Sequence, residues 1–330
     1  MNIAVVILNW NGRSLLEEFL PSVIKYSEEA TVYLADNAST DDSISYTQTS
    51  FPQVKIIRNE MNGGYAKGYN DALAKIDADI YCLLNSDVEV TQNWLVPVIK
   101  TFETSKEVAA IQPKILDYKK KSHFEYAGAA GGYIDKLGYA YCRGRIFDTL
   151  EEDKGQYNDT TPIFWASGAC LFIRKQVFEE VGKLDEDFFA HQEEIDLCWR
   201  IHNQGYKIMY DGSSVIYHLG GATLGTMNPK KTFLNFRNSL YLLVKNVPGN
   251  SVWGLIFIRM LMDGLAAARF ILQGKFSHFL AIFKAHLSFY ANFNTFIKKR
   301  KKLSKTGKYY SFFSVVWQYF ILKRKHFNQL

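Results

Sequence analysis

Four polar clusters, each following a short apolar segment, hold the residues of this 330-residue chain that are best suited to chemistry. They are residues 9–12, 36–43, 59–64 and 85–89, and most of their members are Asn, Asp, Ser, Thr or Gly. Such carboxylates and amides bind cations and polar ligands, and a carboxylate can also take up a proton. Turns favour the same residues, so one cluster alone has an ordinary explanation. Four clusters in succession favour an active site.

The elements that must position these clusters alternate between strands and helices. Apolar runs predict strands at 3–8, 31–35, 54–57 and 80–84, and helical spacing predicts helices at 14–26 and 68–76. Alternation of this kind is typical of a parallel α/β sheet that is covered on both faces. In such sheets ligands bind beyond the carboxyl ends of the strands, which is where all four clusters fall.

The last hundred residues differ from the rest in charge. The segment 231–330 has 17 Lys and Arg residues but a single acid, Asp263, whereas residues 1–230 have 22 basic and 32 acidic residues. The segment 252–272 is as long as a membrane span, but Arg259, Asp263 and Arg269 interrupt it on one side of the predicted helix. We therefore expect an amphipathic helix in a membrane interface, not a spanning one.

A second amphipathic pattern runs over residues 279–297 and is followed by basic residues at 298–302, 305, 308 and 323–325. Aromatic amphipathic helices beside a basic run predict that the helical region 231–330 associates with an anionic membrane surface. The alternative is a set of helices that pack on the rest of the chain. The region has no helix-turn-helix, RNA-recognition or zinc-finger signature, so we expect no nucleic-acid partner.

Several other classes of protein are disfavoured. No G-x-G-x-x-G follows the first strand and no Walker A sequence occurs, which argues against dinucleotide oxidoreductases and P-loop enzymes. The four cysteines are widely spaced, so we expect buried small apolar residues, not a disulfide framework or a zinc ribbon. The N-terminus has neither the basic region nor the cleavage site of a signal peptide, and we expect it to remain in the cytoplasm.

Four motifs together resemble the family-2 inverting glycosyltransferases, and in particular the rhamnosyltransferase-like branch that builds bacterial cell-surface polysaccharides. They are the run 34–41, the run 62–70, Asn85-Ser86-Asp87, and the run 188–200 followed by Gly205-Tyr206. The resemblance covers about residues 1–240. It implies a GT-A α/β fold over residues 1–230 and a donor that is a UDP- or dTDP-linked sugar.

The resemblance also implies how the donor is held. Asp36 would accept a hydrogen bond from the pyrimidine ring, and Asn85-Ser86-Asp87 stands where the family has its Asp-x-Asp motif, with Asn as the first residue. Asp87 would bind Mg²⁺ or Mn²⁺, and His218 is the second candidate metal ligand. One Asp at a strand end suits a hard cation, which takes its other ligands from water and phosphate. The other candidate donor-binding residues are Asn9, Asn11, Asn37, Asn62, Gly63, Asn85, Ser86 and Asp185.

An inverting transfer is a direct displacement and needs a base for the acceptor hydroxyl. The resemblance places this base at Glu194, where the family usually has Asp, with Glu193 as the alternative. Asp196 completes the acidic group, and we expect it to pair with Arg200 four residues on and to orient the loop. An Arg-Asn pair is common in this branch at the position of Arg237 and Asn238, where it could contact diphosphate.

These features predict an enzyme that transfers one sugar to a glycan or a polyprenyl-diphosphate-linked acceptor on the inner face of the plasma membrane. The Gln-x-x-Arg-Trp motif of processive synthases is absent, which favours a single addition. Two alternatives stay open. One is a nucleotide-sugar hydrolase or nucleotidyltransferase, and the other is a non-catalytic membrane adaptor with a degenerate transferase domain.

Overall fold

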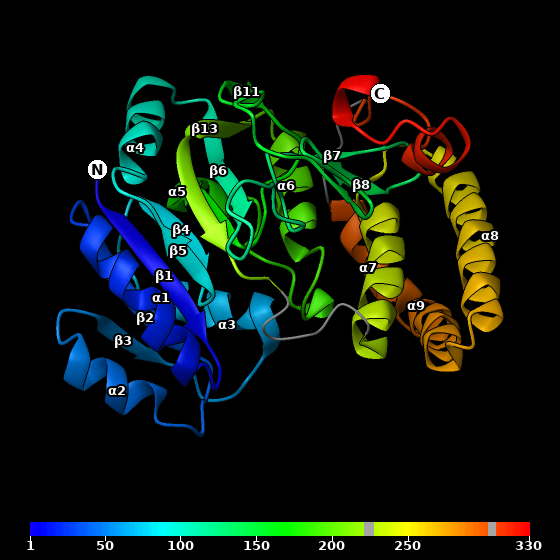
Figure 1. Ribbon diagram of the computed structural model, residues 1–330. Helices are drawn as coiled ribbons and strands as arrows, with labels where there is room; N and C mark the ends of the chain where they lie inside the picture. Colours follow the sequence, from blue (N-terminus) through cyan, green and yellow to red (C-terminus); the bar gives the residue numbers. More distant parts are fainter. Residues whose placement is uncertain (221–227, 303–307) are drawn as a thin grey trace.

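The centre of the molecule is a mixed β-sheet with helices on both faces (Figure 1). The computed structural model describes residues 1–220, 228–302 and 308–330, and within them the sheet has nine strands in the order β11-β13-β6-β12-β4-β1-β2-β3, with β5 paired to β13. The strands are β1 Ile3–Asn9, β2 Ala30–Asp36, β3 Lys55–Arg58, β4 Ile80–Asn85, β5 Val88–Val90, β6 Val108–Asp117, β11 Thr160–Pro162, β12 Cys170–Arg174 and β13 Lys207–His218. The helices are α1 Arg13–Tyr26, α2 Ser43–Ser50, α3 Gly64–Leu73, α4 Leu95–Thr104, α5 Lys175–Glu180, α6 Glu193–Asn203, α7 Pro229–Asn246, α8 Ser251–Leu272 and α9 Phe276–Lys302.

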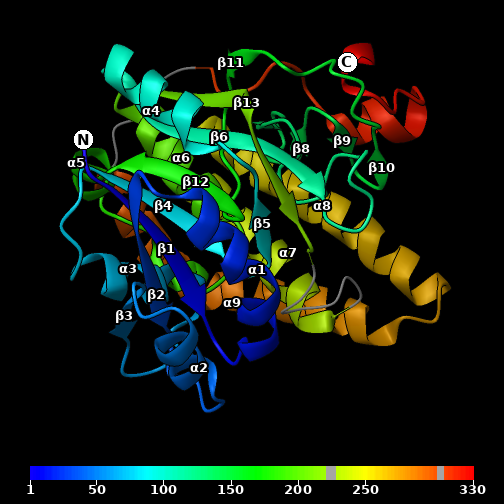
Figure 2. The same cartoon turned by 60° about the vertical axis from the view of Figure 1, so that its left-hand side comes forward.

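The first four predicted strands form one parallel part of this sheet, β6 and β13 form another, and the α/β fold is confirmed. β1 lies between β2 and β4 and is parallel to both, as the order of strands in Figure 2 shows. Their registers pair Asn9 with Asp36 and Leu8 with Asn85, and β3 adds Arg58 beside Asp36. The carboxyl ends of the strands are therefore level, and the polar clusters meet at one edge.

The sheet is not parallel throughout, which corrects the sequence-based expectation. β12 runs antiparallel to both β4 and β6. A parallel neighbour needs a crossover, usually a helix, to carry the chain back to the starting edge. Between β6 and β12 the chain instead forms a four-stranded sheet, so it returns from the edge at which β6 ends. That small sheet consists of β7 Gly132–Ile134, β8 Ala140–Cys142, β9 Arg145–Ile146 and β10 Thr149–Leu150.

Alternating residues of β1 explain the two covered faces. Val5 belongs to a hydrophobic cluster that contains Leu16 of α1 and Leu95 of α4. Val6 points to the other face, into a cluster that contains Tyr69 of α3 and Leu197 of α6. Since successive side chains of a strand point to opposite faces, a continuous apolar strand indicates burial on both. All four cysteines are buried and free, as predicted.

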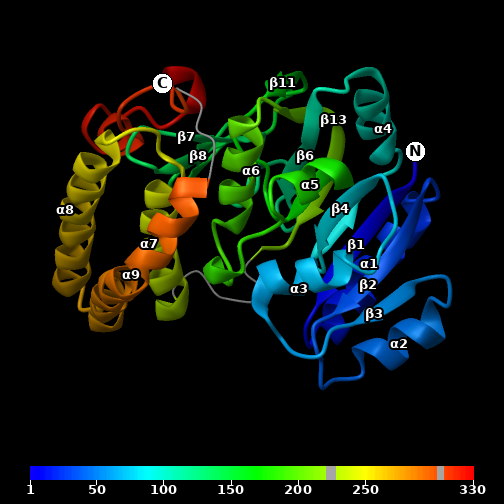
Figure 3. The ribbon, with the colours of Figure 1, turned by 180° about the vertical axis from the view of Figure 1, so that it is seen from behind.

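Helices α7, α8 and α9 stand together beside the sheet in Figures 1 and 3. Leu240 and Leu243 of α7, Val252 of α8, and Phe296 of α9 belong to the same hydrophobic cluster as the strand residue Val6. Tyr241 stacks on Phe296 with 3.7 Å between the ring centroids. The helical region therefore shares one hydrophobic core with the sheet.

Two of the three charged residues of α8, Arg259 and Asp263, face the protein and not water, contrary to what an isolated interfacial helix would do. Arg259 and Asp263 are buried and form the expected i,i+4 ion pair at 3.0 Å. Arg259 also donates to Ser239 Oγ at 3.0 Å and to Leu137 O at 3.3 Å. The opposite, apolar side of α8 is consequently turned outward.

The C-terminal segment returns to the small sheet. Val315 is buried against Tyr141 and Ile146, and its N–H donates to Asp135 Oδ2 at 2.7 Å. The predicted basic position 305 lies outside the described residues. Across the three ranges that the structure describes, no helix is both long and apolar enough to cross a bilayer.

Candidate active site

The first part of the site lies where β1 and β2 end. Asn9 Nδ2 donates to Asp36 Oδ1 and to Ser39 Oγ, both at 3.1 Å, and Asp36 Oδ2 accepts from Ser39 N at 3.0 Å. Asn11 adopts a left-handed conformation with φ of 51°, and its Oδ1 accepts from Thr40 N at 2.7 Å. The buried Asn9 Oδ1 makes no hydrogen bond. The structure thus brings Asn9, Asn11 and Asp36 together.

A chain of hydrogen-bonded amides links the residues around Asp36 to the segment 62–64 before α3, which we call the glycine loop. Asn37 Nδ2 donates to Asn62 Oδ1 at 3.0 Å, and Asn62 Oδ1 also accepts from Gly64 N at 3.0 Å. Gly64 has φ of +79°, and a Cβ there would lie 2.5 Å from Phe189 O, so glycine is required. Tyr65 N also donates to Phe189 O at 2.9 Å. The loop before α6 therefore packs directly against the glycine loop. Gly63 stands directly before Gly64.

Asp87 and His218 form the candidate metal centre. Asp87 Oδ1 lies 3.1 Å from His218 Nε2, because β5 pairs with β13 in a register that sets Val88 opposite His218. Asn85 Nδ2 lies 3.4 Å from the same His218 nitrogen. Ser86 borders the turn at Gly12, where a Cβ would come within 3.9 Å of Ser86 Oγ. The Asn-Ser-Asp run and His218 are therefore neighbours.

The two candidate ligands fit a divalent ion. Neighbouring ligands of an octahedral Mg²⁺, each about 2.1 Å from the ion, lie about 3 Å apart, close to the Asp87–His218 separation. Among the residues that the structure describes, no group of three or more His, Cys, Asp or Glu could hold a metal. Water and the donor diphosphate would have to supply the remaining ligands, which suits a site that loads the ion with its substrate.

Glu125 was not anticipated from the sequence. Its Oε2 lies 3.2 Å from His218 Nδ1, on the side of the ring opposite Asp87. Burial by itself lowers the pKa of His218, but the hydrogen bonds to Asp87 and Glu125 outweigh it and raise this pKa to about 10. A divalent ion would have to displace the proton that these carboxylates stabilise on His218 before Nε2 could act as a ligand. Glu125 lies in no motif, so only the fold reveals it. Glu89 pairs with Lys121 at 2.6 Å.

Glu193 and Glu194 begin α6, next to the glycine loop. Their Oε2 atoms are both buried without a hydrogen-bond partner. Burial raises the pKa of Glu194 to about 7, and burial together with the charge of Glu194 also raises the pKa of Glu193 well above its ordinary value. A helix N-terminus favours carboxylate charge, but here the loss of water outweighs it. A carboxyl group with a pKa near 7 is suited to act as a base at neutral pH.

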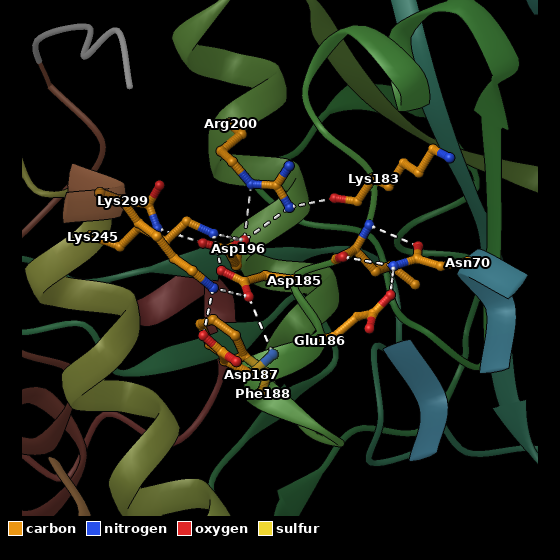
Figure 4. Close-up of polar contacts among 12 residues, drawn as sticks. Asn70, Lys183, Asp185, Glu186, Asp187, Phe188, Asp196, Arg200, Lys245 and Lys299 are labelled. Carbon is orange, nitrogen blue, oxygen red and sulfur yellow. Dashed lines mark hydrogen bonds and ion pairs between the residues drawn. The ribbon is translucent and has the colours of Figure 1, made fainter. Parts of the chain in front are cut away.

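Behind the glutamate pair lies a buried ionic network (Figure 4). Arg200 Nε donates to Asp196 Oδ2 at 2.9 Å, which confirms the predicted pairing, and Lys245 of α7 bonds the same oxygen at 2.8 Å. Lys245 also bonds Asp185 Oδ2 at 2.6 Å, and Lys299 of α9 bonds Asp185 Oδ1 at 2.5 Å. Asp185 therefore faces α7 and α9, and both of its oxygens are bound by lysines. A donor contact from Asp185 stays a prediction.

Lys245 was also missed at the sequence level, although a signal existed. It is the only charge in the apolar run Leu240–Lys245, and a lysine in such a position must find a carboxylate once it is buried. Arg237 and Asn238, expected near diphosphate, instead bind backbone carbonyls of residues 187–191. α7 thus contacts the segment that leads into the glutamate pair.

The fold and the comparisons with known proteins together define a class of protein, the glycosyltransferases. The model of the family described as glycosyl transferase family 2 matches residues 4–182, and the chain belongs to that family. It is of the rhamnosyltransferase-like type, as predicted. A relative from Mycobacterium tuberculosis, N-acetylglucosaminyl-diphospho-decaprenol L-rhamnosyltransferase, is 25% identical over 80% of this chain and 90% of its own length.

Solved structures share the fold at low sequence identity. GalNAc-T7 with UDP, GalNAc and Mn²⁺ superposes with a TM-score of 0.58 at 18% identity, over 74% of this chain and 48% of its own. The mannosyltransferase PcManGT from Pyrobaculum calidifontis, in complex with GDP-Man and Mn²⁺, gives a TM-score of 0.52 at 13% identity, over 91% and 84%. The GT-A fold is therefore confirmed.

Proposed function

We propose that this glycosyltransferase moves a single sugar, with inversion, from a UDP- or dTDP-sugar to a lipid-linked or glycan acceptor in cell-surface polysaccharide synthesis. One observation carries the proposal. The loop before Glu194 rests on the glycine loop of the donor side, through Phe189 O and the backbone of Gly64 and Tyr65. A candidate base and a candidate nucleotide pocket therefore border the same space.

Asp87 and His218 would hold Mg²⁺ or Mn²⁺, and Asp36 with Asn9 and Asn11 would line the nucleotide pocket. A divalent ion bound there neutralises charge on the departing nucleoside diphosphate. Two structural relatives crystallised with Mn²⁺ support a divalent metal. The carboxylates of Asp87 and Glu125, at 3.1 and 3.2 Å from the His218 ring, support the same assignment.

Glu194 would take the proton from the acceptor hydroxyl. The hydroxyl oxygen then forms a bond to the anomeric carbon on the face opposite the diphosphate, and the bond between that carbon and the diphosphate oxygen breaks. The nucleoside diphosphate departs with the bonding electrons, and the anomeric configuration inverts because the hydroxyl attacks the face opposite the diphosphate. Glu194 is left protonated, and Asp196 with Arg200 would hold the helix that carries it.

We propose a polyprenyl-diphosphate-linked acceptor at the inner face of the plasma membrane. The Mycobacterium tuberculosis relative, named for such an acceptor, aligns with 80% of this chain and supports the assignment. A second support is the outward surface of α8 and α9, which we call the hairpin face. Its large exposed apolar residues are Trp253, Phe257, Ile258, Leu261, Leu265, Ile271, Leu272, Phe276, Leu280, Phe283, Leu287 and Tyr290.

The hairpin face joins two helical stripes. Trp253 packs near Phe293, with ring centroids 5.9 Å apart, and Tyr290 OH lies 3.3 Å from Met260 Sδ, so the two helices adjoin along their length. A surface on which so many large apolar side chains are exposed marks an interaction site. The charge of the region favours a bilayer as the occupant, because Asp263 is the one acid after residue 230 and it is buried.

A symmetric dimer through the hairpin face is the less favourable occupant. Two copies related by a twofold axis would bring the same basic rim, with Arg269 and Lys284 exposed, against itself. An anionic bilayer accepts the aromatic residues at its interface and attracts the basic ones. Lys299 and Arg300 of the basic run are turned toward the protein, so this surface depends on its apolar residues more than the sequence suggested.

The test is nucleotide release with UDP- and dTDP-sugars, Mn²⁺ and a polyprenyl-diphosphate-linked acceptor. We expect release that requires acceptor and metal, yields a product of inverted configuration, and is lost in Asp87→Ala. Glu89→Gln is the matched control, because Glu89 is two residues away and pairs with the exposed Lys121. Release without acceptor would favour a hydrolase, and donor binding without any turnover would favour an adaptor.

A further inference from the structure

The segment between Phe188 and α6 has an unusual backbone. Phe189, His191 and Gln192 have φ of 63°, 69° and 71°, in the left-handed region that non-glycine residues rarely adopt. A segment in this conformation persists only when surrounding contacts hold it, and such segments cluster at functional sites. Glu193 and Glu194 follow it directly. The position of the proposed base therefore depends on whatever holds residues 188–192.

A single side chain of α7 holds most of this segment. Asn238 is fully buried, and its Nδ2 donates to the carbonyls of Phe188 at 3.0 Å, Ala190 at 2.9 Å and His191 at 2.7 Å. Its Oδ1 accepts from Arg237 Nε at 3.0 Å. Every polar atom of the Asn238 side chain is thus engaged, which leaves no donor for a diphosphate.

The carbonyl of Phe189 is held from the opposite side. Phe189 O accepts from Tyr65 N, directly after the glycine loop, at 2.9 Å. Gln192 Nε2 adds a hydrogen bond to Asn235 O at 3.2 Å, again on α7. The segment before the glutamate pair is therefore clamped between the donor-side loop and α7. The matched family region ends at residue 182, so α7 lies outside it.

We propose that Asn238 is a positioning residue for Glu194: it holds the left-handed segment in place and thereby fixes the carboxylate against the acceptor hydroxyl. The inference rests on the proposed function. The chemistry at position 238 demands a short side chain with N–H donors, because three carbonyl oxygens converge there. An aspartate would bring negative charge against those oxygens, and an aliphatic residue would leave them buried without partners.

The test compares Asn238→Ala and Asn238→Ser with wild type in steady-state transfer kinetics. We expect kcat to fall about 100-fold in the alanine variant and less in the serine variant, which keeps one donor. KM for the donor and the thermal shift caused by the nucleotide should stay within twofold, because residues 9–12, 36–43 and 85–87 are untouched. Ser239→Ala, a buried neighbour on α7 that does not bind the loop, is the control and should keep its kcat.

Two results would overturn the inference: kcat within twofold of wild type in both variants, or a loss that falls on the donor KM. If the alanine variant does not fold, the serine variant decides, and the nucleotide-induced thermal shift reports whether it is folded. Wild-type protein without transfer activity would instead refute the proposed function, so the two failures are distinguishable.

Discussion

Glu194 combines two properties at the residue scale: it lies at a helix N-terminus and it is deprived of water. Its carboxylate oxygen Oε2 has no hydrogen-bond partner, and burial raises its pKa to about 7. The sequence motif predicted which residue to examine, but not the depth of burial. That depth is set by contacts of the neighbouring loop with α7 and with the glycine loop, which are distant in sequence.

We expect kcat to rise with pH through a midpoint near 7, because only ionised Glu194 can accept a proton. Glu194→Gln should lower kcat by about 10²–10⁴-fold while donor binding is kept. Glu193→Gln should lower it less, since Glu194 is the assigned base and Glu193 the alternative. The measurement is a pH–rate profile with saturating donor. A flat profile between pH 5 and 8, or a fully active Glu194→Gln enzyme, would contradict this assignment.

The same burial has a consequence for stability, with a definite sign. The pKa of Glu194 is higher in the folded chain than its ordinary 4.5, so the folded state binds the proton more tightly. Stability contributed by that proton is lost as pH rises through about 4.5 to 7. Glu194→Gln has no carboxyl group to lose this proton at position 194. The Tm of the variant should therefore fall less than that of wild type between pH 5 and 8.

At the scale of elements, α7 connects the region matched by the family to the helices that follow. Its Lys245 lies between Asp185, which precedes the loop, and Asp196 of α6. Burial raises the pKa values of these acids, but Lys245 and the neighbouring cations outweigh it and lower both. Element types were predictable here from apolar spacing alone. The pairing of these elements was not, because it depends on side chains 49 and 60 residues apart.

Lys245→Met should destabilise the folded protein by about 3–5 kcal/mol, because it leaves two buried carboxylates short of a partner. The exposed Lys298→Met provides the matched control and should shift stability by less than about 0.5 kcal/mol. Urea unfolding at pH 7 measures both. The deficit should shrink as pH falls below about 4, where the acids of the variant protonate. Equal stability of the two variants would show that the network contributes little.

Over the whole molecule, the sequence predicted the strands and helices of the α/β sheet better than it predicted how these elements pack and connect. The alternation of apolar strands and helices predicted the parallel half of the sheet, and the polar clusters predicted its active edge. The antiparallel β12 could not be foreseen, because it follows from the absence of a helix in residues 118–169. The inward turn of Arg259 and Asp263 was equally hidden, since amphipathic spacing shows two faces of a helix but not which one meets the protein.

The hairpin face leads to a prediction at this scale. The protein should co-sediment with vesicles of phosphatidylcholine and phosphatidylglycerol, more weakly with phosphatidylcholine alone, and less at high salt. Phe257→Asp combined with Leu261→Asp should abolish binding without lowering Tm, because both side chains are exposed by more than half. Val96→Asp, on the exposed side of α4, is the control.

Retained vesicle binding in the double variant would exclude the hairpin face as the contact. A stable dimer in solution that becomes monomeric in the double variant would assign this face to a second copy of the chain. Either result would leave the proposed transfer chemistry untouched, since the hairpin face includes none of the candidate site residues.

The core that α7, α8 and α9 share with the sheet has a geometric consequence. Because the described residues of the hairpin helices and of α6 share that core, the proposed contact with a bilayer would fix the height of Glu194 above it. An enzyme anchored in this way would select its acceptor by the distance between the reacting hydroxyl and the bilayer. It would reach a hydroxyl at one distance from the lipid and would pass over the same sugar placed one residue further along the glycan.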